Sequence, residues 1–255
     1  MQIQLQRGRS EKSPLWLYEY PQPNARYYIG ADAARGVEDG DFSAAVGFNG
    51  NTGEQAFTWA NREGVEVFAY HLNLLGHFFN RAMLNIEVTG GDGAHTQKLL
   101  RDKYRYPTWY LWRGRDDKRT GRPRADTLGY ETQWRSRQRL LVSFREGISS
   151  GACIIRDRRI FQQMSNAVRD DPLIRWEVTK GHDDIFMGAM LGWKAIDDYP
   201  PPKIAGTVTN TMEKSAQQPQ PMLPFQTEPC DWLREKFRVT MKFTTKRARP
   251  MLEGV

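Results

Sequence analysis

Residues 26–48 read RYYIGADAARGVEDGDFSAAVGF, and this stretch predicts the start of a β-sheet. Residues 26–33 and 42–48 are rich in aromatic, β-branched and small apolar side chains, which favour strands, and a Gly/Asp-rich turn separates them. An Asn-Gly step at residues 49–50 then marks a hairpin, after which residues 55–60 predict a third strand. The sequence therefore predicts an antiparallel meander.

Beyond the meander, helical and strand patterns alternate along the chain. In chain order we expect a helix over 64–79, a strand over 83–88, a helix over 94–104, a strand over 108–112, a helix over 132–147, a strand over 152–156, a helix over 159–168, a strand over 173–178 and a helix over 183–196. Strands separated by helices favour parallel pairing. The expected fold class is α/β, with a mixed sheet of an antiparallel meander plus parallel strands and with helices on both faces.

The composition predicts one α/β domain between two polar extensions. We expect an N-terminal arm over residues 1–25, the domain over residues 26–198 and a Pro-containing, basic C-terminal tail over residues 199–255. Hydrophobic residues make up 39% and charged residues 26%, as in ordinary globular proteins. No apolar run of about 18 residues occurs, and no apolar stretch follows the N-terminus, so neither a transmembrane helix nor a secretory signal is expected.

The net charge of +7, with an isoelectric point near 9.4, favours an anionic partner, of which nucleic acid is the commonest. The two cysteines, Cys153 and Cys230, lie far apart in the sequence and have no CxxC or Cys/His spacing around them. Neither a zinc site nor a disulfide framework is therefore expected.

Acidic residues stand at three points where the predicted elements begin or end. Asp32 ends the first strand between small residues, which leave room for a substrate backbone, and Glu87 lies in an apolar strand, where an unpaired carboxylate is costly. Asp183 and Asp184 open the last helix. Each position also has a structural interpretation: Asp32 as a turn residue, Glu87 as a helix cap, and the aspartate pair as acids favoured by a helix dipole.

If these acids converge, their mutual repulsion is relieved by hard divalent cations, which prefer oxygen ligands. Two such cations about 3.5–4 Å apart are a known arrangement for cleaving phosphodiesters. The order of an Asp after the first strand, a Glu after a later strand and an Asp pair at the last helix is more specific than any one of these positions.

Three segments carry a resemblance to a known family: YIGADAARGVEDGDFSAAV at 28–46, LNIEVTGGDG at 84–93 and KGHDDIFMGAMLG at 180–192. They resemble the C-terminal nuclease domain of the large subunit of tailed-bacteriophage terminases. The match spans residues 26–198 with the order and spacing of the segments intact. The resemblance implies an RNase H-like, or resolvase-like, fold.

Carried onto this sequence, the resemblance also implies a catalytic site with Mg²⁺ or Mn²⁺ in a two-metal arrangement. The implied catalytic and metal-ligating residues are Asp32, Glu87, Asp184 and Asp183. Which member of the Asp183–Asp184 pair binds metal directly stays open. Asp41, in the turn after the first strand, and His182, before the pair, are candidates for supporting roles, beside their interpretations as a turn residue and a helix-entry residue.

The function that follows from the resemblance is that of a metal-dependent endodeoxyribonuclease, which cuts double-stranded phage DNA concatemers during genome packaging in the host cytoplasm. The partners it implies are double-stranded DNA, an ATPase motor, the small terminase subunit and the portal, with no membrane. A phosphate-binding loop of the form GxxxxGK followed by Ser or Thr does not occur, so no ATPase motor is expected in this chain.

A basic loop at residues 113–124 is the predicted DNA-binding segment, with a solvated loop as the alternative. Its basic residues are Arg113, Arg115, Lys118, Arg119, Arg122 and Arg124. Contacts from such a loop to phosphates would be independent of DNA sequence and sensitive to salt. Arg135, Arg137 and Arg139 extend the run of basic residues.

Two other functions compete with this one. A Holliday-junction resolvase or a transposase would use the same fold. A comparison of the cleavage of four-way junctions with that of linear duplexes separates a resolvase from a terminase-type nuclease. A non-catalytic DNA-binding module of a packaging complex would use the acids only to stabilise turns. Replacing Asp32 with Asn would then leave any activity untouched.

Overall fold

The structure, a computed structural model, describes six stretches of the chain: residues 13–37, 40–112, 127–165, 167–170, 175–178 and 182–202. The basic loop at 113–124, with its six predicted DNA-binding residues, lies outside these stretches. So do residues 1–12 of the expected arm and residues 203–255 of the expected tail.

A mixed five-stranded sheet forms the centre of the fold, with the strand order β1-β4-β3-β2-β5. Its strands are β1 (Leu15–Leu17), β2 (Tyr27–Asp32), β3 (Ser43–Asn49), β4 (Gln55–Asn61) and β5 (Met83–Ile86). The strands β2, β3 and β4 form the predicted antiparallel meander, and β5 pairs with β2 in parallel. The predicted fold class is confirmed.

The edge strand β1 lies within the segment that we expected to be an arm. It pairs antiparallel with β4, with Leu15 opposite Trp59 and Leu17 opposite Phe57. Both leucines are buried, because alternate residues of a strand point to the same face of a sheet. A three-residue strand next to polar residues carries too short an alternation to be recognised in the sequence.

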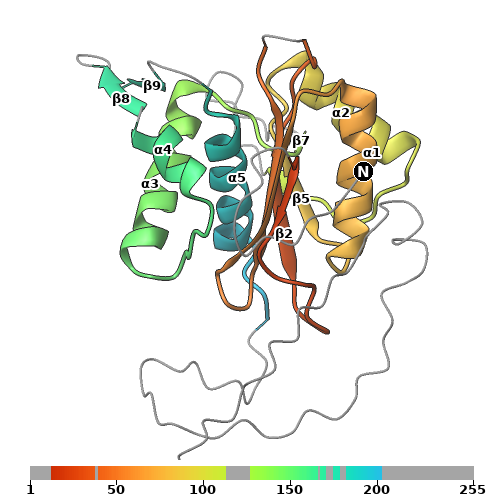
Figure 1. Cartoon of the computed structure of the whole chain (residues 1–255), viewed down its shortest axis with the longest axis horizontal. Helices are drawn as coiled ribbons and strands as arrows, with labels where there is room; N and C mark the ends of the chain where they lie inside the picture. Colours follow the sequence, from red (N-terminus) through yellow and green to blue (C-terminus); the bar gives the residue numbers. More distant parts are fainter. Residues whose placement is uncertain are drawn as a thin grey trace, which may run out of the picture.

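Helices cover both faces of the sheet (Figure 1). The helices α1 (Val65–Phe78) and α2 (Gly91–Asp102) lie on one side, and α5 (Asp184–Asp198) lies on the other. The helices α3 (Trp134–Ser149) and α4 (Arg158–Ser165) pack against α5 on the side away from the sheet. Among the described residues, no helix is both long and apolar enough to cross a membrane.

The side chains of β2 divide between the two faces. Tyr27, Ile29 and Ala31 pack in the apolar cluster with α1 and α2, whereas Tyr28 packs with α5. By the same alternation Asp32, at the end of β2, falls on the α5 side.

Helix α5 packs directly against the backbone of β2. A Cβ atom at Gly30 would lie 2.0 Å from the carbonyl oxygen of Gly188 and 2.1 Å from the amide nitrogen of Gly192, so only glycine fits there. The side chain of Asn85, on β5, donates a hydrogen bond of 2.8 Å to the carbonyl oxygen of Leu191. These contacts fix the helix over the sheet and place its first residues next to the ends of β2 and β5.

The remaining predicted strands lie outside the central sheet. The strand predicted at 108–112 is reduced to β6 (Leu111–Trp112), which pairs with β7 (Thr127–Leu128), while single bridges connect Leu84 with Trp109 and Glu87 with Tyr130. The strand predicted at 173–178 contains β9 (Arg175–Val178), which pairs with β8 (Ala167–Asp170) in a separate two-stranded sheet.

The strand predicted at 152–156 is a single bridge between Ile154 and Glu54. Beyond this bridge, the side chain of Gln55 replaces the missing strand partner, because its Oε1 atom accepts hydrogen bonds from the backbone nitrogens of Arg156 and Asp157 (2.8 and 2.9 Å). An apolar run can therefore look like a strand while a side chain satisfies its backbone.

Candidate active site

A pocket of about 370 Å³ lies where β2 and β5 end and α5 begins. Its acidic lining residues are Asp32, Asp41, Glu87, Asp92, Asp183 and Asp184, and its basic lining residues are Arg35 and Arg137. The four residues predicted to be catalytic therefore line one pocket, although they come from three separate parts of the sequence.

Asp32 is the last residue of β2 and is partly buried in the pocket wall. Burial raises the pKa of its carboxyl group well above the usual value, and the nearby charges of Glu87, Asp184 and Asp183 raise it further. The charge of Arg137 acts in the opposite direction. The carboxylates are thus close enough to repel one another.

Asp184 is the first residue of α5 and is only 5% exposed. Burial raises the pKa of its carboxyl group to about 6, although the backbone N–H of Phe42 donates a hydrogen bond of 2.9 Å to Oδ2 and so favours the charged form. The charges of Asp41 and Asp183 raise this pKa as well, and His182 lowers it. The hydrogen bond from Phe42 fixes the orientation of the carboxylate.

Asp183 differs from its neighbour in exposure and in partner. It is the N-cap residue of α5, but its side chain makes no capping hydrogen bond. Instead it accepts a hydrogen bond from the guanidinium group of Arg137 and keeps 25% of its side-chain surface exposed. Helix capping therefore does not explain this acid.

Glu87 directly follows β5, and its backbone N–H donates a hydrogen bond of 3.0 Å to the carbonyl oxygen of Ala31. The hydroxyl group of Thr132 donates a hydrogen bond to its Oε1 atom. Its Oε2 atom lies 3.5 Å from the backbone nitrogen of Gly90, the N-cap residue of α2, so any capping of that helix is weak. The main partner of the Glu87 carboxylate is Thr132.

The two candidates for supporting roles, Asp41 and His182, lie next to each other at this site. Nδ1 of His182 is 2.9 Å from Oδ1 of Asp41 and 3.9 Å from Oδ2 of Asp184. The three side chains offer ligand atoms within 4.8 Å of one another, which is close enough to hold a metal ion. Asp41 is 71% exposed, so it lies at the rim.

Two polar partners of the acids were not expected from the sequence. The segment that contains Thr132 has no motif, and Arg137 looks like one of several basic residues that could contact phosphates. Their proximity to Glu87 and Asp183 depends on how residues 127–137 fold beside β5, which a local pattern does not reveal.

The residues of this site suit a hard divalent cation. Such ions prefer carboxylate oxygens, and burial together with the charges of neighbouring carboxylates raises the pKa of Asp32 and of Asp184. Mg²⁺ and Mn²⁺ both fit a set of oxygen ligands of this kind.

No family model and no curated protein matches the sequence. Among solved structures, the large terminase nuclease from thermophilic phage G20c with bound magnesium is similar, with a TM-score of 0.55 and 17% identity over 72% of this chain and 89% of that one. The cobalt-bound form of the same nuclease has a TM-score of 0.55 and 19% identity, with the same coverage.

The large terminase nuclease domain of Thermus phage P74-26 has a TM-score of 0.56 and 15% identity over 72% of this chain and 86% of that one. At these identities the likeness shows the fold. The chain has the fold of the phage large-terminase nuclease domains, as the resemblance in the sequence implied.

Proposed function

We propose that this chain is a metal-dependent endonuclease of the large-terminase type, which cuts double-stranded DNA concatemers during genome packaging. The observation that carries the proposal is the pocket in which Asp32, Glu87, Asp183 and Asp184 converge. A purely structural role does not account for this convergence, in which the charges of neighbouring carboxylates raise the pKa of Asp32 and of Asp184.

The residues of the chain would hold the cations and orient the DNA substrate at the pocket. Asp32, Glu87 and the Asp183–Asp184 pair would hold divalent cations, and the chemistry supplied by the bound metal would be activation of a water molecule and stabilisation of the leaving oxygen. Asp32 is held by its strand, the Glu87 carboxylate by Thr132 and the Asp184 carboxylate by the N–H of Phe42. Supports of this kind keep ligand oxygens in a fixed geometry.

The identity of the cations and of the partners is part of the proposal. The G20c nuclease is described with bound magnesium or cobalt, which supports a divalent metal for this fold. We propose Mg²⁺ or Mn²⁺ for this chain, and double-stranded DNA as its substrate. The basic residues of 113–124 would contact the phosphates, and an ATPase motor, a small terminase subunit and a portal would be the partners in the host cytoplasm.

Nicking of supercoiled plasmid tests the proposal. The wild-type chain should nick plasmid with Mn²⁺ and not with EDTA, and Asp32→Asn and Asp184→Asn should each reduce the rate on the order of 1,000-fold. Asp102→Asn is the matched control, because Asp102 forms an exposed ion pair with Arg101 on α2 and does not line the pocket. Its nicking rate should equal that of the wild type.

Robust nicking by either pocket variant would overturn the mechanism. Cleavage of four-way junctions without cleavage of linear duplex would favour a resolvase instead. A chain that Mn²⁺ neither activates nor stabilises against heat would be a non-catalytic DNA-binding module.

A further inference from the structure

Arg137 lies among the acids of the pocket as their cationic partner. Of the two basic residues that line the pocket, Arg35 has 79% of its side chain exposed and pairs with Asp92 at 3.3 Å, outside the four proposed catalytic acids. Arg137 is 33% exposed, and its guanidinium group donates a hydrogen bond to Asp183. Its positive charge also acts on Asp32.

The backbone that carries Arg137 is firmly held. Ser136, which is 4% exposed, and Gln133 form a capping box at the start of α3. The hydroxyl group of Ser136 also donates a hydrogen bond of 2.8 Å to the carbonyl oxygen of Glu131. The base of the Arg137 side chain is therefore fixed, and only its rotatable chain can change the position of the guanidinium group.

Position on α3 separates Arg137 from the other arginines of this helix. The guanidinium carbon of Arg139 lies 6.0 Å from the ring centre of Trp112, in a different pocket. Arg135, at the start of α3, and Arg145, two turns beyond Arg137, are exposed and line neither pocket. Among the arginines of α3, Arg137 is thus the one that lines the pocket of the four proposed catalytic acids.

A guanidinium group keeps its proton at all ordinary pH values, so its charge cannot be removed by titration. A divalent cation that binds Asp183 must therefore compete with a permanent positive charge already bonded to that carboxylate. A guanidinium group also matches phosphate oxygens in a two-point, planar geometry. Once displaced from Asp183, it would lie in the pocket that receives the scissile phosphate.

We infer that Arg137 exchanges partners during the reaction: it occupies Asp183 in the cation-free protein and contacts the scissile phosphate when cations and DNA are bound. This inference rests on the proposed function and deepens it. Arg137 has opposite effects on two steps, because it weakens cation binding and assists cleavage. A residue that only supported the shape of the pocket would not produce opposite effects.

Mn²⁺ binding and DNA cleavage, measured separately on Arg137→Gln, test the exchange. Titration with Mn²⁺ without DNA, followed by electron paramagnetic resonance, should show about tenfold tighter binding in Arg137→Gln than in the wild type. At saturating Mn²⁺ the same variant should nick plasmid about 100-fold more slowly. Arg137→Lys keeps the charge without the planar fork, so it should bind Mn²⁺ like the wild type and still cleave more slowly.

Arg145→Gln is the matched control, because it removes the same charge from the exposed part of the same helix. It should change neither quantity, and circular dichroism checks that all variants fold. Unchanged or weaker Mn²⁺ binding by Arg137→Gln would overturn the competition for Asp183, and wild-type cleavage would overturn the contact with phosphate. A wild-type chain that binds Mn²⁺ but cuts no DNA would instead contradict the proposed function, while the titration would still test the competition.

Discussion

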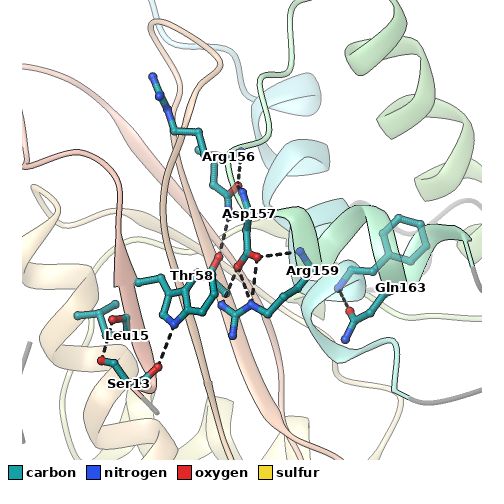
Figure 2. Close-up of polar contacts among 10 residues, drawn as sticks. Ser13, Leu15, Thr58, Arg156, Asp157, Arg159 and Gln163 are labelled. Atoms are coloured by element: carbon teal, nitrogen blue, oxygen red, sulfur yellow. Dashed lines mark hydrogen bonds and ion pairs between the residues drawn. The ribbon is translucent and has the colours of Figure 1, made fainter. Parts of the chain in front are cut away.

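Two carboxylates of this protein are buried to a similar extent but have opposite surroundings. Asp157, just before α4, is fully buried, and Asp184, at the start of α5, is 5% exposed. Figure 2 shows Asp157 with the guanidinium group of Arg159, which donates hydrogen bonds to both carboxylate oxygens, the shortest of them 2.6 Å. The backbone N–H of Arg159 donates a further hydrogen bond of 2.9 Å to Asp157.

Asp184 has a different set of neighbours. It accepts one backbone hydrogen bond, and Asp41 and Asp183 lie close enough to raise its pKa further. Asp157 is therefore paired with a guanidinium group, whereas Asp184 has two carboxylates beside it and His182, at 3.9 Å, as its nearby basic group. The comparison teaches that burial alone does not distinguish these two acids, and that the charges around them do.

The largest expected effect on stability is at the paired carboxylate. Asp157→Asn would leave Arg159 without its anionic partner, and we expect the free energy of unfolding to fall by about 3 kcal/mol. Arg159 also lies over the ring of Trp16, with its guanidinium carbon 3.7 Å from the ring centre, so β1 should loosen as well. Urea unfolding followed by circular dichroism measures the change, and Asp102→Asn provides the exposed control. An unchanged midpoint for Asp157→Asn would contradict the comparison.

Replacing Asp184 with Asn should have the opposite effect, because it should raise the free energy of unfolding. Burial raises the pKa of Asp184 to about 6 from an ordinary value of 3.8, so the folded protein holds this proton more tightly than the unfolded chain. The resulting stability is fully present below about pH 4 and is lost as the pH rises through 6. In EDTA at pH 8, Asp184→Asn should therefore raise the free energy of unfolding by about 2 kcal/mol.

The pH dependence of this gain distinguishes its electrostatic cause from better packing. The difference between Asp184→Asn and the wild type should shrink as the pH falls from 8 to 4, because the wild-type carboxyl group then becomes neutral too. Urea unfolding in EDTA at several pH values measures it. A gain that stays constant over this range, or a loss of stability at pH 8, would refute the electrostatic explanation.

The smallest expected effect is on the rate of nicking, and it comes from the hydrogen bond between Thr132 and the Glu87 carboxylate. Thr132→Val removes the hydroxyl group that donates to Oε1 of Glu87, and we expect plasmid nicking in Mn²⁺ to slow about tenfold. Thr132→Ser keeps this hydroxyl group and should retain the wild-type rate. DNA binding in Ca²⁺ should be the same in all three proteins. Equal nicking rates for the valine and serine variants would show that Thr132 does not orient Glu87.

The sequence predicts the central fold well where patterns are long. The three strands of the meander and the helix α1 end within one or two residues of their expected positions, because their side chains alternate or repeat over several turns. The expected strand at 152–156 fails for a local reason, since the side chain of Gln55 provides the hydrogen bonds that a neighbouring strand would give. The strand β1 was missed because three residues carry no recognisable period.

The candidate site likewise has residues that the sequence predicts and contacts that it does not predict. The positions of Asp32, Glu87 and the Asp183–Asp184 pair could be inferred because each stands where an element begins or ends, and the fold brings them into one pocket. Their roles as ligands stay predictions. The contacts of Thr132 and Arg137 could not be inferred, because they depend on a three-dimensional approach between segments distant in the sequence.

The glycine contact between β2 and α5 has a consequence for biosynthesis. Asp184 reaches the pocket only when α5, the last described helix, packs on Gly30 of the first long strand of the sheet. Contacts between such distant parts of a chain form late in folding. A nascent chain that has not yet made α5 therefore lacks two of the pocket's carboxylates, Asp183 and Asp184, so the pocket is complete only after the whole domain has been synthesised and folded.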